Sequence, residues 1–262
     1  MKNFKDEFWK LQNLLDTDKP FCFNRFSDGE LFILQNKEVR LSQSSYVAGD
    51  TAGQGTYTKE EQKHFIPAEH GYQRLALCES LGYCAPNYFK GIPSRTDIPE
   101  EEFLFMHGLS SDIEEKHLTF ANVFLNSNYP LFMTHTLNKL KNTTRPIAMV
   151  LNEACDTKML PFKITKEFRI GNDCMTNHWD LPKEMADFFE QRRGWIILLS
   201  AASLSNLIAH KCFKSNPKNT IIDIGSTLNP LMGLEGWKYS RDYLKHFWMG
   251  QKSHYCEREE IW

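Results

Sequence analysis

Two carboxylates flank a glycine near the start of the chain, as Asp28, Gly29 and Glu30 in "NRFSDGELFIL". A turn can bring two acids at this spacing onto one divalent cation, because Gly29 permits a tight backbone. Hard cations such as Mn²⁺ and Mg²⁺ take oxygen ligands and also bridge to diphosphate oxygens. The spacing therefore identifies Asp28 and Glu30 as candidate metal ligands. Arg25, just before them, would orient the acids or contact a phosphate.

The same stretch has a simpler structural interpretation. Ser27 and Glu30 have the spacing of a capping box, in which the serine caps a helix and the glutamate bonds back to it. The two interpretations are compatible, since Ser27 can start the helix while Asp28 and Glu30 face a ligand. The pattern leaves open whether Glu30 binds a cation directly or uses its oxygens in the cap.

A second candidate region follows an apolar run in "WIILLSAASLSNLIAHKCF". A buried strand leads into Ser200, Ala201 and Ser203, and a helix begins at once. Small residues let a ligand approach the backbone, and the N–H groups at a helix start suit a phosphate. The alternative is that the small residues only permit close packing and that Ser203 caps the helix. No dinucleotide fingerprint or P-loop is present, because the glycines are missing.

Two further strand ends carry acids. The strand 145–153 delivers Glu153, and the stretch "IIDIGS" delivers Asp223 and Ser226. Either carboxylate could act as a general base toward a sugar hydroxyl or bind a ribose. The structural alternatives are a solvated loop for Glu153, and a helix cap or arginine partner for Asp223.

Buried apolar strands alternate with helices in the second half of the chain. This alternation predicts a mostly parallel sheet flanked by helices, the Rossmann-like α/β class. Binding sites in such sheets lie beyond the carboxyl ends of the strands, where the residues above would meet. We expect one domain over residues 1–262, with the acidic pair in 1–144 and the Rossmann-like part in 145–262.

The first half is less regular, and its elements are predicted from local signals. The residues at 46–62 are expected to form a loop with three glycines that leads into a helix beginning near Thr58. Glycines and prolines predict a loop over 87–103. A helix is expected over 110–128, with a candidate break near Thr119.

Composition excludes several classes of protein. The 262 residues are 41% apolar and 24% charged, with a net charge of −2, so the chain is globular and has no general attraction to nucleic acid. No run approaches the about 20 apolar residues of a membrane span. The amphipathic N-terminus is unlike a secretory signal, so cytoplasmic location is the default expectation. The seven dispersed cysteines predict free thiols and no structural zinc site.

The stretch "NRFSDGELFIL" resembles the "RFGDGE" signature of the GT-D-type glycosyltransferases, a family first catalogued as a bacterial domain of unknown function. Further pieces occur in matching order, including "LSQSS", "RPIAMVLNE" and "IIDIGSTLNP". The chain departs from the family at Ser27, where a glycine is usual. It departs again after Asp223, where members tend toward an acidic "GHxD".

The resemblance implies a Rossmann-like glycosyltransferase in which the D-x-E element binds Mn²⁺ or a similar cation that holds a nucleotide-sugar diphosphate. Carried over, it makes Asp28 and Glu30 the metal or metal-proximal ligands. We predict transfer of a hexosyl or pentosyl group from a UDP-sugar, or another nucleotide sugar, to a glycan or glycoprotein hydroxyl. The alternatives are a nucleotide-sugar or phosphoester hydrolase, and a non-catalytic glycan- or nucleotide-binding domain. The catalytic base stays open between Glu153 and Asp223.

Overall fold

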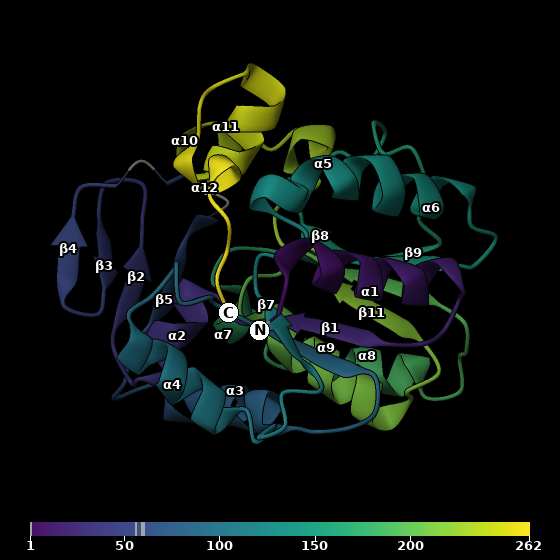
Figure 1. Ribbon diagram of the computed structural model, residues 1–262. Helices are drawn as coiled ribbons and strands as arrows, with labels where there is room; N and C mark the ends of the chain where they lie inside the picture. The colour runs from purple at the N-terminus through teal and green to yellow at the C-terminus, as the bar shows by residue number, and fades with distance from the viewer. Residues whose placement is uncertain (1, 56, 59–60) are drawn as a thin grey trace.

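The computed structural model describes residues 2–55, 57–58 and 61–262 (Figure 1). Its centre is a seven-stranded sheet in the order β7-β6-β1-β11-β10-β8-β9, in which every neighbouring pair is parallel. The strands of this sheet are β1 (Cys22–Arg25), β6 (Tyr88–Ile92), β7 (Leu118–Phe120), β8 (Ile147–Asn152), β9 (Lys166–Ile170), β10 (Ile196–Leu199) and β11 (Thr220–Asp223). Strands from 1–144 and from 145–262 thus share one sheet.

A second, antiparallel sheet has the order β4-β3-β2-β5 and lies to one side of the first (Figure 1). Its strands are β2 (Val39–Leu41), β3 (Tyr46–Ala48), β4 (Thr51–Gly53) and β5 (Lys63–Phe65). We call it the small sheet.

Helices cover both faces of the large sheet, with α8 and α9 on one side and α5 and α6 on the other (Figure 1). The longer helices are α1 (Phe4–Asp16), α2 (Asp28–Leu34), α3 (Gly71–Gly82), α4 (Glu100–Leu109), α6 (Leu137–Asn142), α8 (Leu181–Phe189), α9 (Leu204–Ser215) and α11 (Asp242–Met249). The short ones are α5 (Tyr129–Leu131), α7 (Cys174–Asn177), α10 (Trp237–Ser240) and α12 (His254–Glu257), with 3₁₀ or π turns at Asn126–Asn128, Phe132–Thr136 and Asn229–Met232.

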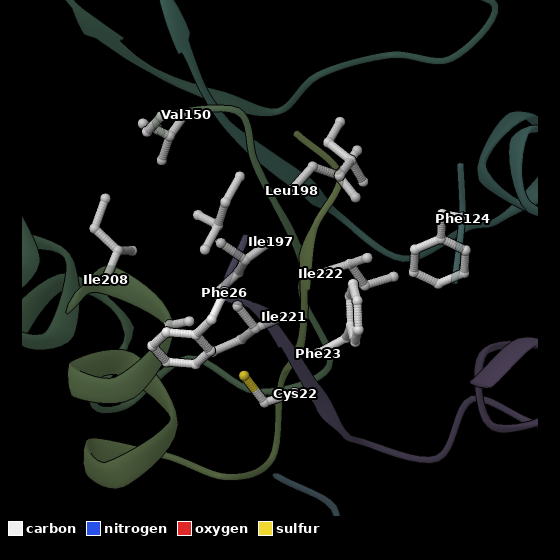
Figure 2. Packing of buried hydrophobic residues seen from close by; sticks show 14 of the residues in the cluster. Cys22, Phe23, Phe26, Phe124, Val150, Ile197, Leu198, Ile208, Ile221 and Ile222 are labelled. Carbon is white, nitrogen blue, oxygen red and sulfur yellow. The ribbon is translucent and has the colours of Figure 1, made fainter. Parts of the chain in front are cut away.

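The core lies between the large sheet and its helices (Figure 2). The central strands β10 and β11 are buried along their whole length, and β10 is a continuous apolar run, as a strand covered on both faces requires. Phe23 of β1 packs edge to face on Phe124, with ring centroids 5.2 Å apart. The N-terminal helix α1 begins because the Asn3 side chain accepts hydrogen bonds from the N–H groups of Lys5 and Asp6.

The predicted strands of the second half are confirmed, and three predictions in the first half are wrong. Residues 87–103 contain the buried strand β6 and the start of α4, not a loop. Residues 110–128 contain β7, not a helix. Strands β3 and β4 replace the loop expected within 46–62. Of the helix expected from Thr58, residues 59–60 lie outside the described part, and β5 follows at Lys63.

The physical reason for the first of these errors lies in β6. Lys90 and Gly91 are poor strand signals, yet the Lys90 side chain is fully buried and its ammonium donates to the Ser110 carbonyl. At Gly91 a Cβ would stand 2.9 Å from the Phe23 ring and 3.0 Å from the Ala121 backbone. Tertiary packing therefore requires residues that local propensity disfavours.

Across the part of the chain that the structure describes, no helix combines the length and apolar character that crossing a bilayer requires.

Candidate active site

The carboxyl ends of the parallel strands meet at one edge of the large sheet, as expected for this class. Strand β1 ends at Arg25 and its neighbour β11 ends at Asp223, while β10 next to it ends just before Ser200. Helix α2 begins three residues after β1, so Asp28 is carried to the same edge.

Buried polar side chains hold the end of β1 against helix α9. The Asn206 amide donates to the Asn24 side chain at 2.8 Å and to the Arg25 carbonyl at 2.7 Å. In return, Asn24 donates to Ser80 and to the Tyr88 hydroxyl, at 3.0 and 2.7 Å. Because these side chains are buried and the donor groups of both asparagine amides are paired, they fix the point from which Arg25 and the following turn leave the sheet.

Glu30 is buried, with 5% of its surface exposed, and most of its hydrogen-bonding capacity is used. Its Oε2 accepts from the backbone N–H of Ser27 at 2.8 Å and from the Ser27 hydroxyl at 2.7 Å, so the predicted capping box is present. Its Oε1 accepts from the Ser203 hydroxyl at 2.6 Å. Burial favours the neutral acid, but Lys63 and these hydrogen bonds outweigh it and lower the pKa of Glu30.

Asp28 differs from Glu30 because its side chain is exposed to solvent. The charges of three cations act on its carboxylate. Its pKa is lowered, because the positive charges of Lys63, Arg25 and Arg241 and a hydrogen bond from the Gly29 backbone outweigh the opposing effect of desolvation. Asp28 is therefore ionised, in a cluster where positive charge predominates.

The described side chains do not fit a divalent cation held jointly by Asp28 and Glu30. A carboxylate has about four acceptor positions, and three of those on Glu30 are occupied. Within residues 2–55, 57–58 and 61–262, no three or more His, Cys, Asp or Glu side chains are grouped so as to hold a metal. The positive charges that lower the pKa of Asp28 most, from Lys63 and Arg25, would repel a cation.

Arg25 lies at the carboxyl edge of the sheet and affects two acids there, Asp28 and Asp223. Its Nε donates to the Ala121 carbonyl at 3.0 Å, and its Nη1 lies 3.4 Å from where a Cβ on Gly225 would stand. Its charge acts on both Asp28 and Asp223. The close approach explains one use of Gly225, which also has the positive φ of +51° that favours glycine.

Asp223 is 5% exposed and accepts a hydrogen bond from the Gly225 N–H at 3.0 Å. Burial raises the pKa of Asp223 to about 7, against the lowering effect of Arg25. A carboxylate with this pKa can gain and lose a proton near neutral pH, as a general base must.

Ser226 follows Gly225 in the chain, and its hydroxyl contacts Arg241. The Arg241 Nε donates to the Ser226 hydroxyl at 3.2 Å, and that hydroxyl lies 2.9 Å from the hydroxyl of Tyr243. Arg241 also faces Glu61, with 3.7 Å between Nη2 and Oε1. The hydroxyl of Ser226, predicted to contact substrate, thus contacts Arg241.

The predicted turn from Ser200 to Ser203 is present between β10 and α9. The Ser203 hydroxyl, however, does not cap helix α9. Ser203 donates to Glu30 instead, and the N–H of Ala201 is bonded to Ser205 at 3.0 Å. Ala202 has a φ of +44°, a strained conformation for a residue with a side chain. Any phosphate contact here would be made by backbone N–H groups at the start of α9.

Glu153 lies apart from this cluster. Its exposed side chain stands beside Gly171, with Oε1 3.4 Å from where a Cβ on that glycine would be. In the described part of the chain, no hydrogen bond or ion pair joins the Glu153 carboxylate to Arg25, Asp28 or Asp223. Of the two predicted bases, only Asp223 faces the other candidate residues.

Sequence reasoning missed three parts of the site. Lys63 and Arg241 supply two of its cations, and His64 forms a pair with Asp173, with 2.7 Å between Nδ1 and Oδ1. Lys63, His64 and Asp173 line one pocket with Ser203. None of these residues belongs to a recognisable motif.

No protein-family model and no curated protein matches the chain. The solved structure of a glycosyltransferase with the domain of unknown function 1792, from Streptococcus sanguinis, is similar with a TM-score of 0.52 and 12% identity, over 97% of this chain and 92% of that chain. The chain shares the fold of this solved glycosyltransferase. Another solved structure of this domain, described as having a distinct glycosyltransferase fold, matches 97% of this chain and 88% of its own, with a TM-score of 0.47 and 12% identity.

The family indicated by the "NRFSDGELFIL" resemblance is therefore also the family of the structural neighbours. The predicted Rossmann-like α/β class is confirmed by the all-parallel central sheet.

Proposed function

We propose that this protein is a glycosyltransferase that moves a hexosyl or pentosyl group from a nucleoside diphosphate sugar to a hydroxyl of a glycan or glycoprotein. The observation that carries the proposal is a group of three cations at the carboxyl edge of the parallel sheet. Lys63 lies at Gly29, Arg25 at Gly225 and Arg241 at Ser226, and the charges of all three act on Asp28. A UDP-sugar is the first donor to test.

The cationic cluster suits the leaving group of this reaction. As the bond between the sugar and the diphosphate breaks, negative charge grows on the phosphate oxygens. Fixed positive charges aimed at that position stabilise the transition state more than the ground state. Backbone N–H groups at the start of α9 would receive a phosphate or the nucleotide.

Asp223 is the proposed general base for an inverting reaction. It would accept the proton of the acceptor hydroxyl while the new bond to the sugar forms and the diphosphate leaves. Its pKa of about 7 and its place beside Arg25 support this role. Glu153 remains the alternative base, without a contact to the cluster.

The Mn²⁺ or Mg²⁺ expected from the family resemblance stays a prediction. Ser27 and Ser203 donate hydrogen bonds to the oxygens of Glu30, so the proposed mechanism uses no metal ion.

A panel of nucleotide sugars with glycan acceptors tests the proposal. We expect release of the nucleoside diphosphate that depends on the acceptor and a product increased by one sugar. Release at the same rate without an acceptor would instead identify a hydrolase. Thermal stabilisation by the nucleotide without any turnover would identify a binding domain.

A further inference from the structure

The ammonium group of Lys63 lies beside the start of α2. Its Nζ is 2.9 Å from the point where a Cβ on Gly29 would stand, so the missing side chain leaves the space that it occupies. Its charge acts on both Asp28 and Glu30. Among the described residues, Lys63 makes no side-chain hydrogen bond and no ion pair within 4.0 Å. It is a cation close to two acids and bonded to neither.

Two contacts to Asp173 hold the strand that carries Lys63. The N–H of Asp173 donates to the Gln62 carbonyl at 3.1 Å, and the His64 ring is bonded to its carboxylate at 2.7 Å. On the other side, β5 is paired with β2, where Lys63 is opposite Leu41. The backbone of Lys63 is thus fixed from both sides, which places its ammonium near the acids.

The acids attract this ammonium by charge, and their surroundings do not favour a second cation. Glu30 is buried and bonded to Ser27 and Ser203, so it acts as a fixed negative charge behind Lys63. The charges of Arg25 and Arg241 also act on Asp28. A divalent ion coordinated by both acids would lie against the ammonium and meet three positive charges.

We infer that Lys63 takes the place of a divalent cation, and that its ammonium, with Arg25 and Arg241, binds the donor diphosphate directly. The site would then accept a nucleoside diphosphate without a metal. This inference rests on the proposed function, and it gives Gly29 a defined use, since any side chain there would displace the ammonium.

Calorimetric titration with UDP tests the inference, in excess EDTA and in Mn²⁺. The wild-type protein is expected to bind UDP with the same affinity in both, within about twofold. Lys63→Ala should weaken binding in EDTA by at least about tenfold, the effect of one lost charge-assisted contact. Gly29→Ala, which keeps the charge but shifts its position, should weaken it by a smaller factor. The control Lys183→Ala removes an exposed lysine of α8, paired with Asp187 at 2.7 Å, and should change nothing.

The outcomes separate this inference from the proposed function. UDP binding in Mn²⁺ that is lost in EDTA would overturn the role of Lys63 and leave the glycosyltransferase proposal standing. Unchanged affinity of folded Lys63→Ala in EDTA would overturn it equally. Failure of UDP, GDP and ADP to bind under either condition would refute the proposed function and this inference with it. Circular dichroism and thermal melting verify that each variant is folded.

Discussion

A single residue, Gly29, separates Asp28 from Glu30 in the D-x-E element, yet the two side chains have different surroundings. This difference can be measured as a difference in the free energy of unfolding between variants. Glu30 is 5% exposed and accepts three hydrogen bonds, two from Ser27 and one from Ser203. Asp28 is exposed and makes no side-chain ion pair within 4.0 Å in the described part of the chain. The perturbation is the pair of isosteric substitutions Glu30→Gln and Asp28→Asn.

The magnitude for Glu30→Gln follows from its three hydrogen bonds. Bonds to a charged group contribute about 1.5–3 kcal/mol and neutral ones about 0.5–1.5 kcal/mol, so three conversions cost about 3 kcal/mol. The substitution also removes the desolvation penalty of a buried charge, which offsets part of this loss of stability. We expect a net loss of about 2 kcal/mol, which for a chain of this size lowers the melting temperature by about 4–8 °C.

Asp28→Asn should also destabilise the fold, because the cations and the Gly29 N–H favour the ionised carboxylate, but by about 1 kcal/mol or less, since solvent screens the charges of this exposed residue. The assay is urea unfolding followed by circular dichroism near neutral pH, with thermal melting as a second measurement. Equal destabilisation by the two substitutions, or none by Glu30→Gln, would refute the account of Glu30 as a buried structural acid.

The pH dependence gives an independent test of the same reasoning. The pKa of Glu30 is lowered in the folded protein, so its contribution is present above the unfolded value of about 4.3 and is lost as the pH falls through the folded value. The stability difference between the wild type and Glu30→Gln should therefore shrink in acid. A stability difference that grows as the pH falls would contradict a lowered pKa of Glu30 in the folded protein.

Three further predictions concern the base, an arginine and a glycine. Because the pKa of Asp223 is raised to about 7, the stability associated with its neutral form is present below the unfolded value and lost as the pH rises through about 7. Asp223→Asn should thus stabilise the fold near pH 8, by on the order of 4 kcal/mol at most, and abolish an ascending limb of kcat/KM centred near pH 7. Ser226→Ala removes the hydroxyl that holds Arg241, and calorimetry should find UDP binding weakened about three- to tenfold with an unchanged melting temperature. Gly91→Ala introduces a Cβ 3.0 Å from neighbouring backbone and should cost about 1–3 kcal/mol in urea unfolding, whereas Gly108→Ala, with no atom within 4 Å, should be neutral or stabilising.

The features that could be predicted from the sequence depend on neighbours along the chain. Apolar runs such as 196–199 determine buried strands, because a strand covered on both faces needs apolar residues throughout. Helices between these strands imply a parallel sheet, and a parallel sheet gathers Arg25 and Asp223 at one edge. The capping box of Ser27 and Glu30 followed from their spacing alone, since both partners lie within one helical turn.

Tertiary structure decided the charges that surround Asp28. Lys63 comes from the small sheet and Arg241 from the C-terminal helices, both far along the chain from Asp28. It also decided that Glu30 bonds to Ser203, 173 residues away, and is left with little capacity to bind a ligand. Spacing within a motif identifies which carboxylate oxygens are neighbours. Whether those oxygens are free to bind a ligand depends on the hydrogen-bond donors that the folded chain places beside them. For that physical reason the acidic pair was visible in the sequence, and its positive surroundings were not.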